Sequence, residues 1–298
     1  MTDLAEHRLA RTLEASALFA ASQTGKTAPA GQPQVGALEH IGRGAMEAGA
    51  SAIALLSFIG ECAIALAGCV ANPARLRWRA VLYNIRSAGF DALPVVALLS
   101  FLLGVVIAYQ GAEQLRRYGA NIFVADLIGL SMLREFAPLI VAIIIAGRSG
   151  SAYAAQIGTM AVTEEIDAMR TLGIAPLDVL VLPKLLALLV ALPLLTVFAD
   201  VVGVFGGMVM ARAQLGVEYG DFLERFTKAV SVTSYLIGIC KAPVFAAIIA
   251  VVGCHQGFLT KGGADGVGRR TTRSVVQSIV LVIIADALFS VAFSALRL

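Results

Sequence analysis

Long apolar runs separated by short polar stretches dominate the pattern of the chain. Five runs are long enough to cross a bilayer, at about 92–112, 122–147, 181–210, 234–254 and 274–296. The segments between them are expected to be a polar linker from Glu113 to Asn121, a polar, partly amphipathic stretch from Ser149 to Leu180, an amphipathic segment at 211–232 and a Gly-rich basic loop with Lys261, Arg269, Arg270 and Arg273. An α-helix rises about 1.5 Å per residue, so about 20 apolar residues cross a hydrocarbon core of about 30 Å. The pattern therefore predicts an all-α integral membrane protein with five transmembrane helices, the third of them kinked at Pro193.

A further apolar stretch at 38–70 is interrupted by three glutamates. Glu61 would lie in hydrocarbon if this stretch crossed the membrane, at a cost of about 2.5–3.5 kcal/mol. A helix in the plane of the interface avoids that cost, so we predict an interfacial (elbow) helix, although its length would also permit a sixth span. Asn72-Pro73 should end it, and the arginines around Trp78 predict an interfacial anchor on the cytoplasmic side. Residues 37–91 thus form an interfacial region.

The N-terminal residues 1–36 are polar, contain prolines and glycines, and are expected to be disordered. Gly25-Lys26-Thr27 resembles the end of a phosphate-binding loop, but Ala20 stands where that motif needs glycine, and no strand precedes it. We therefore expect no ATPase site in this chain. The first residues lack a continuous apolar region, so a cleavable signal peptide is not expected either.

Composition supports the membrane assignment. The 298 residues are 58% hydrophobic and 14% charged, with a mean hydropathy of +0.84, whereas soluble domains are about 25% charged. Lysines and arginines concentrate on one side of the predicted spans, which favours a cytoplasmic N-terminus and a periplasmic C-terminus. The four cysteines show no CxxC spacing and the three histidines are isolated, so a metal site and metal-dependent hydrolysis have little support.

A short amphipathic helix is predicted at 163–173, between the second and third spans. Thr163 is a suitable N-cap, acidic residues follow in the first turn, and Gly173 suits the position after the helix. Val162, Ile166, Met169 and Leu172 follow helical spacing and form one apolar stripe. Such a helix serves equally well as an ordinary interfacial helix or as a docking element for a soluble partner.

Several longer motifs follow one another along the chain. They are Leu133-Arg134-Glu135-Phe136-Ala137-Pro138, Ala146-Gly147-Arg148-Ser149-Gly150-Ser151, Gln156-Ile157-Gly158-Thr159-Met160, Thr163-Glu164-Glu165-Ile166-Asp167-Ala168-Met169, Leu182-Pro183-Lys184 and Gly266-Val267-Gly268-Arg269-Arg270-Thr271-Thr272-Arg273. Over roughly 38–298 the chain resembles the MlaE (YrbE) permease family. Members of that family are the membrane subunits of ABC transporters that move phospholipids or other lipids between envelope membranes.

The resemblance implies a five-span permease domain at 92–298 in the inner membrane, paired with a second permease as a homodimer. Its further partners would be a cytoplasmic ATPase that uses ATP and Mg²⁺, a periplasmic MCE-domain lipid-binding protein and the lipid itself. No cofactor bound by this chain and no nucleic acid are implied. The residues implied to contact the ATPase are Thr163, Glu164, Glu165, Ile166, Asp167, Met169, Arg170 and Leu172.

Arg134 and Glu135 lie near the middle of the second span, where charges are costly unless they are paired or face a cavity. One interpretation is an ion pair that fixes helix packing, and the other is a polar spot in a lipid pathway. The resemblance favours a cavity at the permease dimer interface, lined by Ile107, Leu115, Tyr118, Arg134 and Glu135. Asp126 and Asp286 are further intramembrane acids without an assigned role.

Two other classes of function compete with an ABC permease. An ion-coupled secondary transporter would explain the buried acids, but such proteins tend to show paired broken helices in two repeats, and no such pairing is visible. A membrane-embedded lipid-modifying enzyme would need a catalytic set near one membrane face, and no Ser/His/Asp or His/Asp set is present there. Gly203, Gly206, Gly207 and Ala211 are interpreted as a helix-packing stripe.

Overall fold

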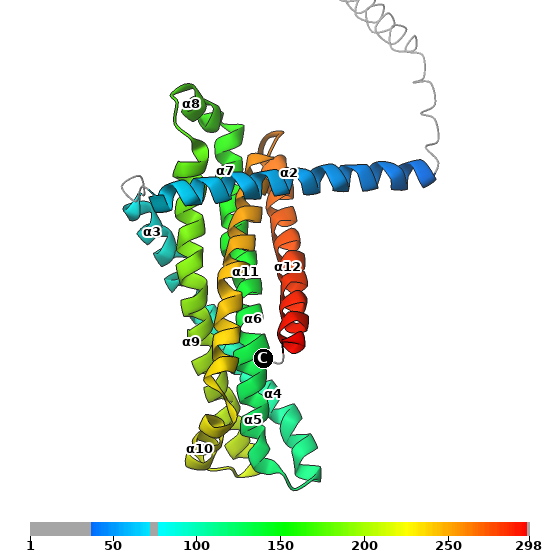
Figure 1. The fold of residues 1–298 in the computed structure, drawn as a ribbon, viewed down its shortest axis with the longest axis vertical. Coiled ribbons are helices and arrows are strands. Elements are labelled where there is room, and N and C mark those ends of the chain that lie inside the picture. The colour runs from blue at the N-terminus through cyan, green and yellow to red at the C-terminus, as the bar shows by residue number, and fades with distance from the viewer. Residues whose placement is uncertain (1–36, 72–76, 297–298) are drawn as a thin grey trace, which may run out of the picture. The chain divides into compact units, whose positions relative to one another are not determined.

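The computed structural model describes residues 37–71 and 77–296, and these are helical with no strand (Figure 1). The chain divides into two units, one ending at Ala54 and the other beginning at Leu55. The α-helices are α2 (Ala37–Ala71), α3 (Trp78–Ala88), α4 (Leu93–Arg117), α5 (Val124–Ser131), α6 (Ala137–Ile145), α7 (Ser151–Val162), α8 (Glu165–Thr171), α9 (Leu182–Leu215), α10 (Tyr219–Ala229), α11 (Val232–Phe258) and α12 (Gly263–Ala295). The predictions for residues 1–36, for Asn72-Pro73 and for Arg75 lie outside the described residues.

Short helical turns of other kinds join some of these helices. The turns η2 (Phe90–Ala92) and η3 (Asn121–Phe123) are 3₁₀-helical. The turns η4 (Met132–Phe136), η5 (Ala146–Gly150) and η6 (Leu177–Val181) are π-helical. The π-turns let a helix continue where its hydrogen-bond register changes by one residue.

Among the described residues, six helical segments are long and apolar enough to cross a membrane. They are Gly49–Cys69, Trp78–Arg117, Asn121–Val162, Leu177–Leu215, Val232–Phe258 and Gly263–Ala295. This confirms an all-α integral membrane protein. By length and composition, residues 49–69 could cross a membrane, as the sequence already allowed. Their placement in the interface therefore stays a prediction. The Phe58 ring lies 5.3 Å from His255 and 5.9 Å from Phe258, which places it beside the C-terminal end of α11.

The membrane helices are longer than the sequence predicted. Residues 149–162 were expected to form a polar stretch outside the second span, but α7 continues that helix through η5 and buries Tyr153 and Ile157. The prediction was wrong because hydroxyl side chains can return hydrogen bonds to their own helix, as Ser151 does to the Gly147 carbonyl and Thr159 to the Ala155 carbonyl. Polar residues therefore did not mark the end of the helix.

Two predicted connections are also helical. The glycine-rich basic loop expected between the fourth and fifth spans is mostly the N-terminal part of α12, and only 259–262 separate it from α11. Its arginines are compatible with a helix because Arg270 donates a 3.1 Å hydrogen bond to the Gln256 side chain. The polar linker expected from Glu113 begins later, because α4 extends to Arg117. The amphipathic segment predicted at 211–232 contains α10, as expected.

Helices α4 and α9 pack closely because small residues face each other. A Cβ atom on Gly104 would lie 1.9 Å from the Gly203 carbonyl oxygen, and one on Gly206 would lie 2.3 Å from the Phe101 carbonyl oxygen. Only glycine allows two helix backbones to approach this closely. The predicted packing role of the stripe on α9 is confirmed. Pro193 lies inside α9, which remains one continuous helix, and the predicted kink stays a prediction.

Replacing Gly104 by valine should separate α4 from α9. The new side chain meets backbone atoms that cannot rotate away, so we expect a destabilisation of at least about 1–3 kcal/mol. Thermal unfolding of the detergent-purified protein measures it as a lower midpoint. Gly60→Ala is the matched control, because nothing lies within 4 Å of its new Cβ. Equal midpoints for the two variants would contradict the close approach.

Candidate functional site

Helix α8 is a short, separately bounded helix between two buried membrane helices. It follows α7 after a sharp backbone turn at Glu164, whose φ of 61° is in the left-handed region. It ends at Thr171, and Gly173 adopts a φ of 73°, which agrees with the predicted helix stop. Figure 1 shows α8 at one end of the helices and α10 at the other, joined through the long α9. A soluble protein can therefore reach α8 without meeting α10.

The start of α8 differs from the prediction. Glu164, not Thr163, precedes the helix, and no side chain caps it. The Thr163 hydroxyl instead lies 3.1 Å from the Thr159 carbonyl and 3.1 Å from a Glu165 carboxylate oxygen. The N-cap prediction was wrong because α7 continues up to Val162. Thr163 is therefore the C-cap of α7, and its hydroxyl donates to the Thr159 carbonyl of that helix.

Some residues of α8 pack against the rest of the protein, and others are exposed. Ile166 is buried, Met169 packs against the core, and both hold the helix to the protein. Leu172 is 76% exposed, and Asp167 and Arg170 form an exposed ion pair of 3.0 Å. The predicted apolar stripe is thus divided, with its middle anchored and its end free. An anchored helix with an exposed leucine beside charges is suited to docking.

A cluster of charged side chains joins three membrane helices. Lys241 on α11 has no exposed surface and lies 2.6 Å from Glu135 on η4 and 2.9 Å from Asp286 on α12. Ser290 donates to Glu135 at 3.0 Å, and the Arg134 guanidinium lies 3.8 Å from the same carboxylate. Two cations and two carboxylates make the cluster formally neutral, as buried ionic groups in a membrane require.

Glycine brings this cluster together. A Cβ atom on Gly238 would lie 1.9 Å from the Leu133 carbonyl oxygen, so α11 and η4 touch through their backbones. Lys241 follows Gly238 by almost one helical turn and therefore reaches Glu135. The interhelical ion pair was one of the two interpretations of the charges in the second span. Sequence reasoning missed Lys241, which stands alone within apolar residues.

The five residues predicted to line a lipid cavity are not all brought together. Ile107 and Leu115 on α4 are half-buried and pack against the core, whereas Tyr118 follows the end of α4 and is 81% exposed. Arg134 and Glu135 lie at the charge cluster. The lining of a cavity by these five residues stays a prediction.

Charged residues also connect elements at both ends of the membrane helices. Arg148 on η5 donates to the Ser87 carbonyl at 3.1 Å and lies 3.6 Å from Asp91, so these residues lie at the same level of the helices. Arg225 on α10 forms hydrogen bonds of 2.7 and 2.6 Å with Asp126. The hydrogen bond to the Asp126 carboxylate raises the pKa of Arg225, so this guanidinium stays charged. Asp126 thus holds α10 against α5.

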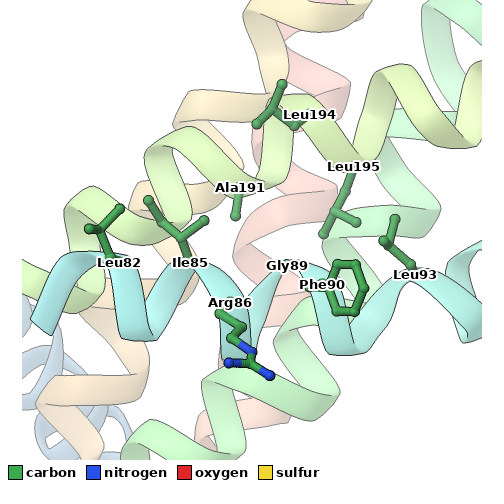
Figure 2. A pocket seen from close by; sticks show the side chains of 9 residues that line it. All are labelled: Leu82, Ile85, Arg86, Gly89, Phe90, Leu93, Ala191, Leu194 and Leu195. Atoms are coloured by element: carbon green, nitrogen blue, oxygen red, sulfur yellow. The ribbon is translucent and has the colours of Figure 1, made fainter. Parts of the chain in front are cut away.

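An apolar groove of about 510 Å³ lies between α3, the start of α4, and α9 (Figure 2). Its lining residues are Leu82, Ile85, Arg86, Gly89, Phe90, Leu93, Ala191, Leu194 and Leu195. Figure 2 shows apolar side chains between α9 and the segment that runs from α3 into α4, with the Arg86 guanidinium pointing away from α9. The groove contains none of the five predicted cavity residues.

The fold and these sites define a polytopic helical membrane protein with an anchored, partly exposed short helix α8 and an ionic cluster between its membrane helices. The family model described as Permease MlaE matches residues 81–292. The chain belongs to this family of permeases.

Known relatives agree with this assignment. A probable ABC transporter permease protein of Rickettsia typhi is 35% identical over 237 residues, which cover 80% of this chain and 89% of the relative. A probable ABC transporter permease protein of Synechocystis is 36% identical over 72% of this chain and 82% of the relative. The chloroplastic protein TRIGALACTOSYLDIACYLGLYCEROL 1 of Arabidopsis thaliana is 36% identical over 72% of this chain and 62% of its own length. The chain is accordingly a multi-pass membrane permease.

Replacing Lys241 by methionine should destabilise the membrane core strongly. The change leaves Glu135 and Asp286 facing each other without their shared cation, and breaking a buried ion pair costs about 3–5 kcal/mol. Fluorescence-detected size exclusion after heating should show a lower midpoint. The double variant Lys241→Met, Asp286→Asn should recover most of the lost stability, because the remaining Arg134 and Glu135 leave the cluster neutral again. A double variant as unstable as the single one would rule out the charge imbalance as the cause.

Proposed function

We propose that this chain is the permease subunit of an ABC transporter that moves phospholipid or a related lipid between envelope membranes. A separate cytoplasmic subunit hydrolyses ATP, and the permease works as a homodimer with a periplasmic MCE-domain lipid-binding protein. The chain lies in the inner membrane with its N-terminus cytoplasmic and its C-terminus periplasmic. The observation that carries this proposal is α8, an exposed helix anchored between two membrane helices in a permease.

The coupling role rests on how α8 is attached. Its buried Ile166 and half-buried Met169 make the helix part of the membrane domain, while Leu172 and the Asp167–Arg170 pair remain accessible. A force applied to α8 would pass into α7 before it and, through η6, into α9 after it. Both neighbours are packed against α11. Docking of an ATPase on α8 can therefore shift the membrane helices as rigid elements.

A lipid cargo is supported by chemistry and by one relative. The Arabidopsis relative carries the name of a galactosylated diacylglycerol, which is a lipid. Arg134 is partly exposed beside the charge cluster, and an arginine binds phosphate well because its guanidinium donates two parallel hydrogen bonds. The surrounding apolar helices would suit acyl chains. An ion-coupled transporter is the alternative that the buried acids favour, and ion-driven transport by the purified chain alone would support it.

Charge reversal on α8 tests the coupling role. Glu165→Lys combined with Asp167→Lys should abolish the binding of the ATPase that co-purifies with the native complex, and lipid transport should fall at least tenfold. Quantitative mass spectrometry of the purified complex and transport between reconstituted membranes measure the two effects. The matched control is Glu218→Lys with Asp221→Lys at α10, on the opposite end of α9. If the α8 variant retains both ATPase binding and lipid transport, the docking assignment is wrong.

Photo-crosslinking tests the predicted lipid cavity. A photoreactive amino acid at Leu115 or Tyr118 of the assembled transporter should capture phospholipid in amounts that change when ATP is added, because the cavity is expected to change shape during the cycle. The control position is Leu98, which is exposed on the same helix α4. Capture there should be independent of ATP. ATP-independent capture at all three positions would place Leu115 and Tyr118 at the ordinary lipid boundary.

A further inference from the structure

Asp200 is a buried acid that the proposed transport function does not use. It lies on α9 and is 4% exposed, and neither of its carboxylate oxygens has a hydrogen-bond partner among the described residues. The contrast with Glu135 and Asp286 is clear, since both are paired with Lys241. An ionised carboxylate without a partner is unfavourable in a membrane core, so a partner from outside the chain would stabilise it.

Asp200 lines a cavity of about 380 Å³ formed by α9, the end of α10 and the start of α11. The full lining is Leu133, Val197, Asp200, Val201, Val204, Phe226, Thr227, Val230, Ser231, Val232 and Tyr235. Val201 is 66% exposed and Val232 is 74% exposed, so the cavity opens to the outside between α9 and α11. A ligand could enter sideways from the membrane.

The lining determines which ligand fits. It offers one carboxylate, two aromatic rings (Phe226 and Tyr235) and no lysine or arginine. A divalent metal prefers six or more oxygen ligands, or a set of histidines and cysteines, and a single carboxylate does not provide these. An organic ammonium group, in contrast, is bound by a carboxylate together with aromatic faces. The five valines and one leucine that share the lining would suit a hydrocarbon chain attached to such a group.

We propose that this cavity binds an organic ammonium group, with Asp200 as its counter-ion and Phe226 and Tyr235 as its aromatic walls. The ammonium could belong to the headgroup of a zwitterionic lipid or to a free amine. The position of the cavity favours the lipid, because α10 ends at Ala229 and α11 begins at Val232, where the chain enters the membrane again. This inference does not depend on the ATPase or on the direction of transport.

Competition between two matched lipids tests the proposal. The full chain is reconstituted in nanodiscs of phosphatidylglycerol that contain equal small amounts of phosphatidylethanolamine and N-acetyl phosphatidylethanolamine, which lacks the ammonium. Native mass spectrometry then counts the lipids that remain bound. The wild-type chain should retain phosphatidylethanolamine about tenfold over its acetylated form, as expected for one charge-assisted contact.

Two variants assign that preference to Asp200. Asp200→Asn keeps the shape but removes the charge, and it should retain both lipids equally. Thr196→Val is the matched control, one turn earlier on α9, since its buried hydroxyl bonds to the Leu192 carbonyl and it does not line the cavity. It should keep the wild-type preference. A preference that persists in Asp200→Asn overturns the proposal.

The two sources of the ammonium are separated in the same nanodiscs. Free ethanolamine that displaces phosphatidylethanolamine at millimolar concentration identifies a soluble amine as a sufficient ligand, and displacement only by the lipid identifies the headgroup. If Asp200→Asn does not fold, the wild-type chain alone decides. A wild-type chain with no preference between the two lipids overturns the proposal. The charge of Asp200 would then be neutralised by a proton or by a cation from a second subunit, and not by the lipid ammonium.

Discussion

Hydrocarbon offers no hydrogen-bond partners, and the structure of this permease depends on that constraint. Every polar group placed between the membrane interfaces must be satisfied by the protein or by a ligand. Helices satisfy the backbone, and hydroxyl side chains such as Ser151, Thr159 and Thr196 return hydrogen bonds to carbonyls of their own helix. Lys241 follows the same rule, since this buried cation has two carboxylates within 3 Å.

The constraint also explains why glycines determine the packing. Helices in lipid gain little from burying apolar side chains, because lipid is equally apolar, so close backbone contact matters more. Gly104 and Gly203 bring α4 against α9, and Gly238 brings α11 against η4. The second contact carries a chemical consequence, because the short distance allows Lys241 to reach Glu135. The ion pair in the core therefore depends on the close helix packing at Gly238.

The sequence predicted the membrane fold and the existence of the short helix α8 well. Hydropathy located the membrane helices, and Gly173 marked the end of α8 correctly because its left-handed backbone favours glycine. Helix ends were predicted less well, since most residues from Ser149 to Val162 are polar or small and yet the segment is helical. Whether such residues leave a helix depends on neighbours from α11 and α12, which are distant in sequence.

The ionic cluster shows most clearly what the sequence alone could not provide. Glu135 and Lys241 are 106 positions apart, and Asp126 and Arg225 are 99 apart, so no local pattern pairs them. The charges themselves were visible, and their cost in lipid already indicated partners. The identity of each partner needed the fold.

The three π-turns relate these features to transport. Turn η4 carries Glu135 of the charge cluster, η5 carries Arg148, which donates to the Ser87 carbonyl of α3, and η6 leads from α8 into α9. A π-turn holds one residue more than the α-helical register and often occurs at functional sites. A helix can move its extra residue along the chain with a small change in hydrogen bonding, whereas a regular α-helix would have to break. Motion at α8 would therefore be absorbed first at η5 and η6, and the charge cluster at η4 would respond only if the helices between them move as rigid bodies.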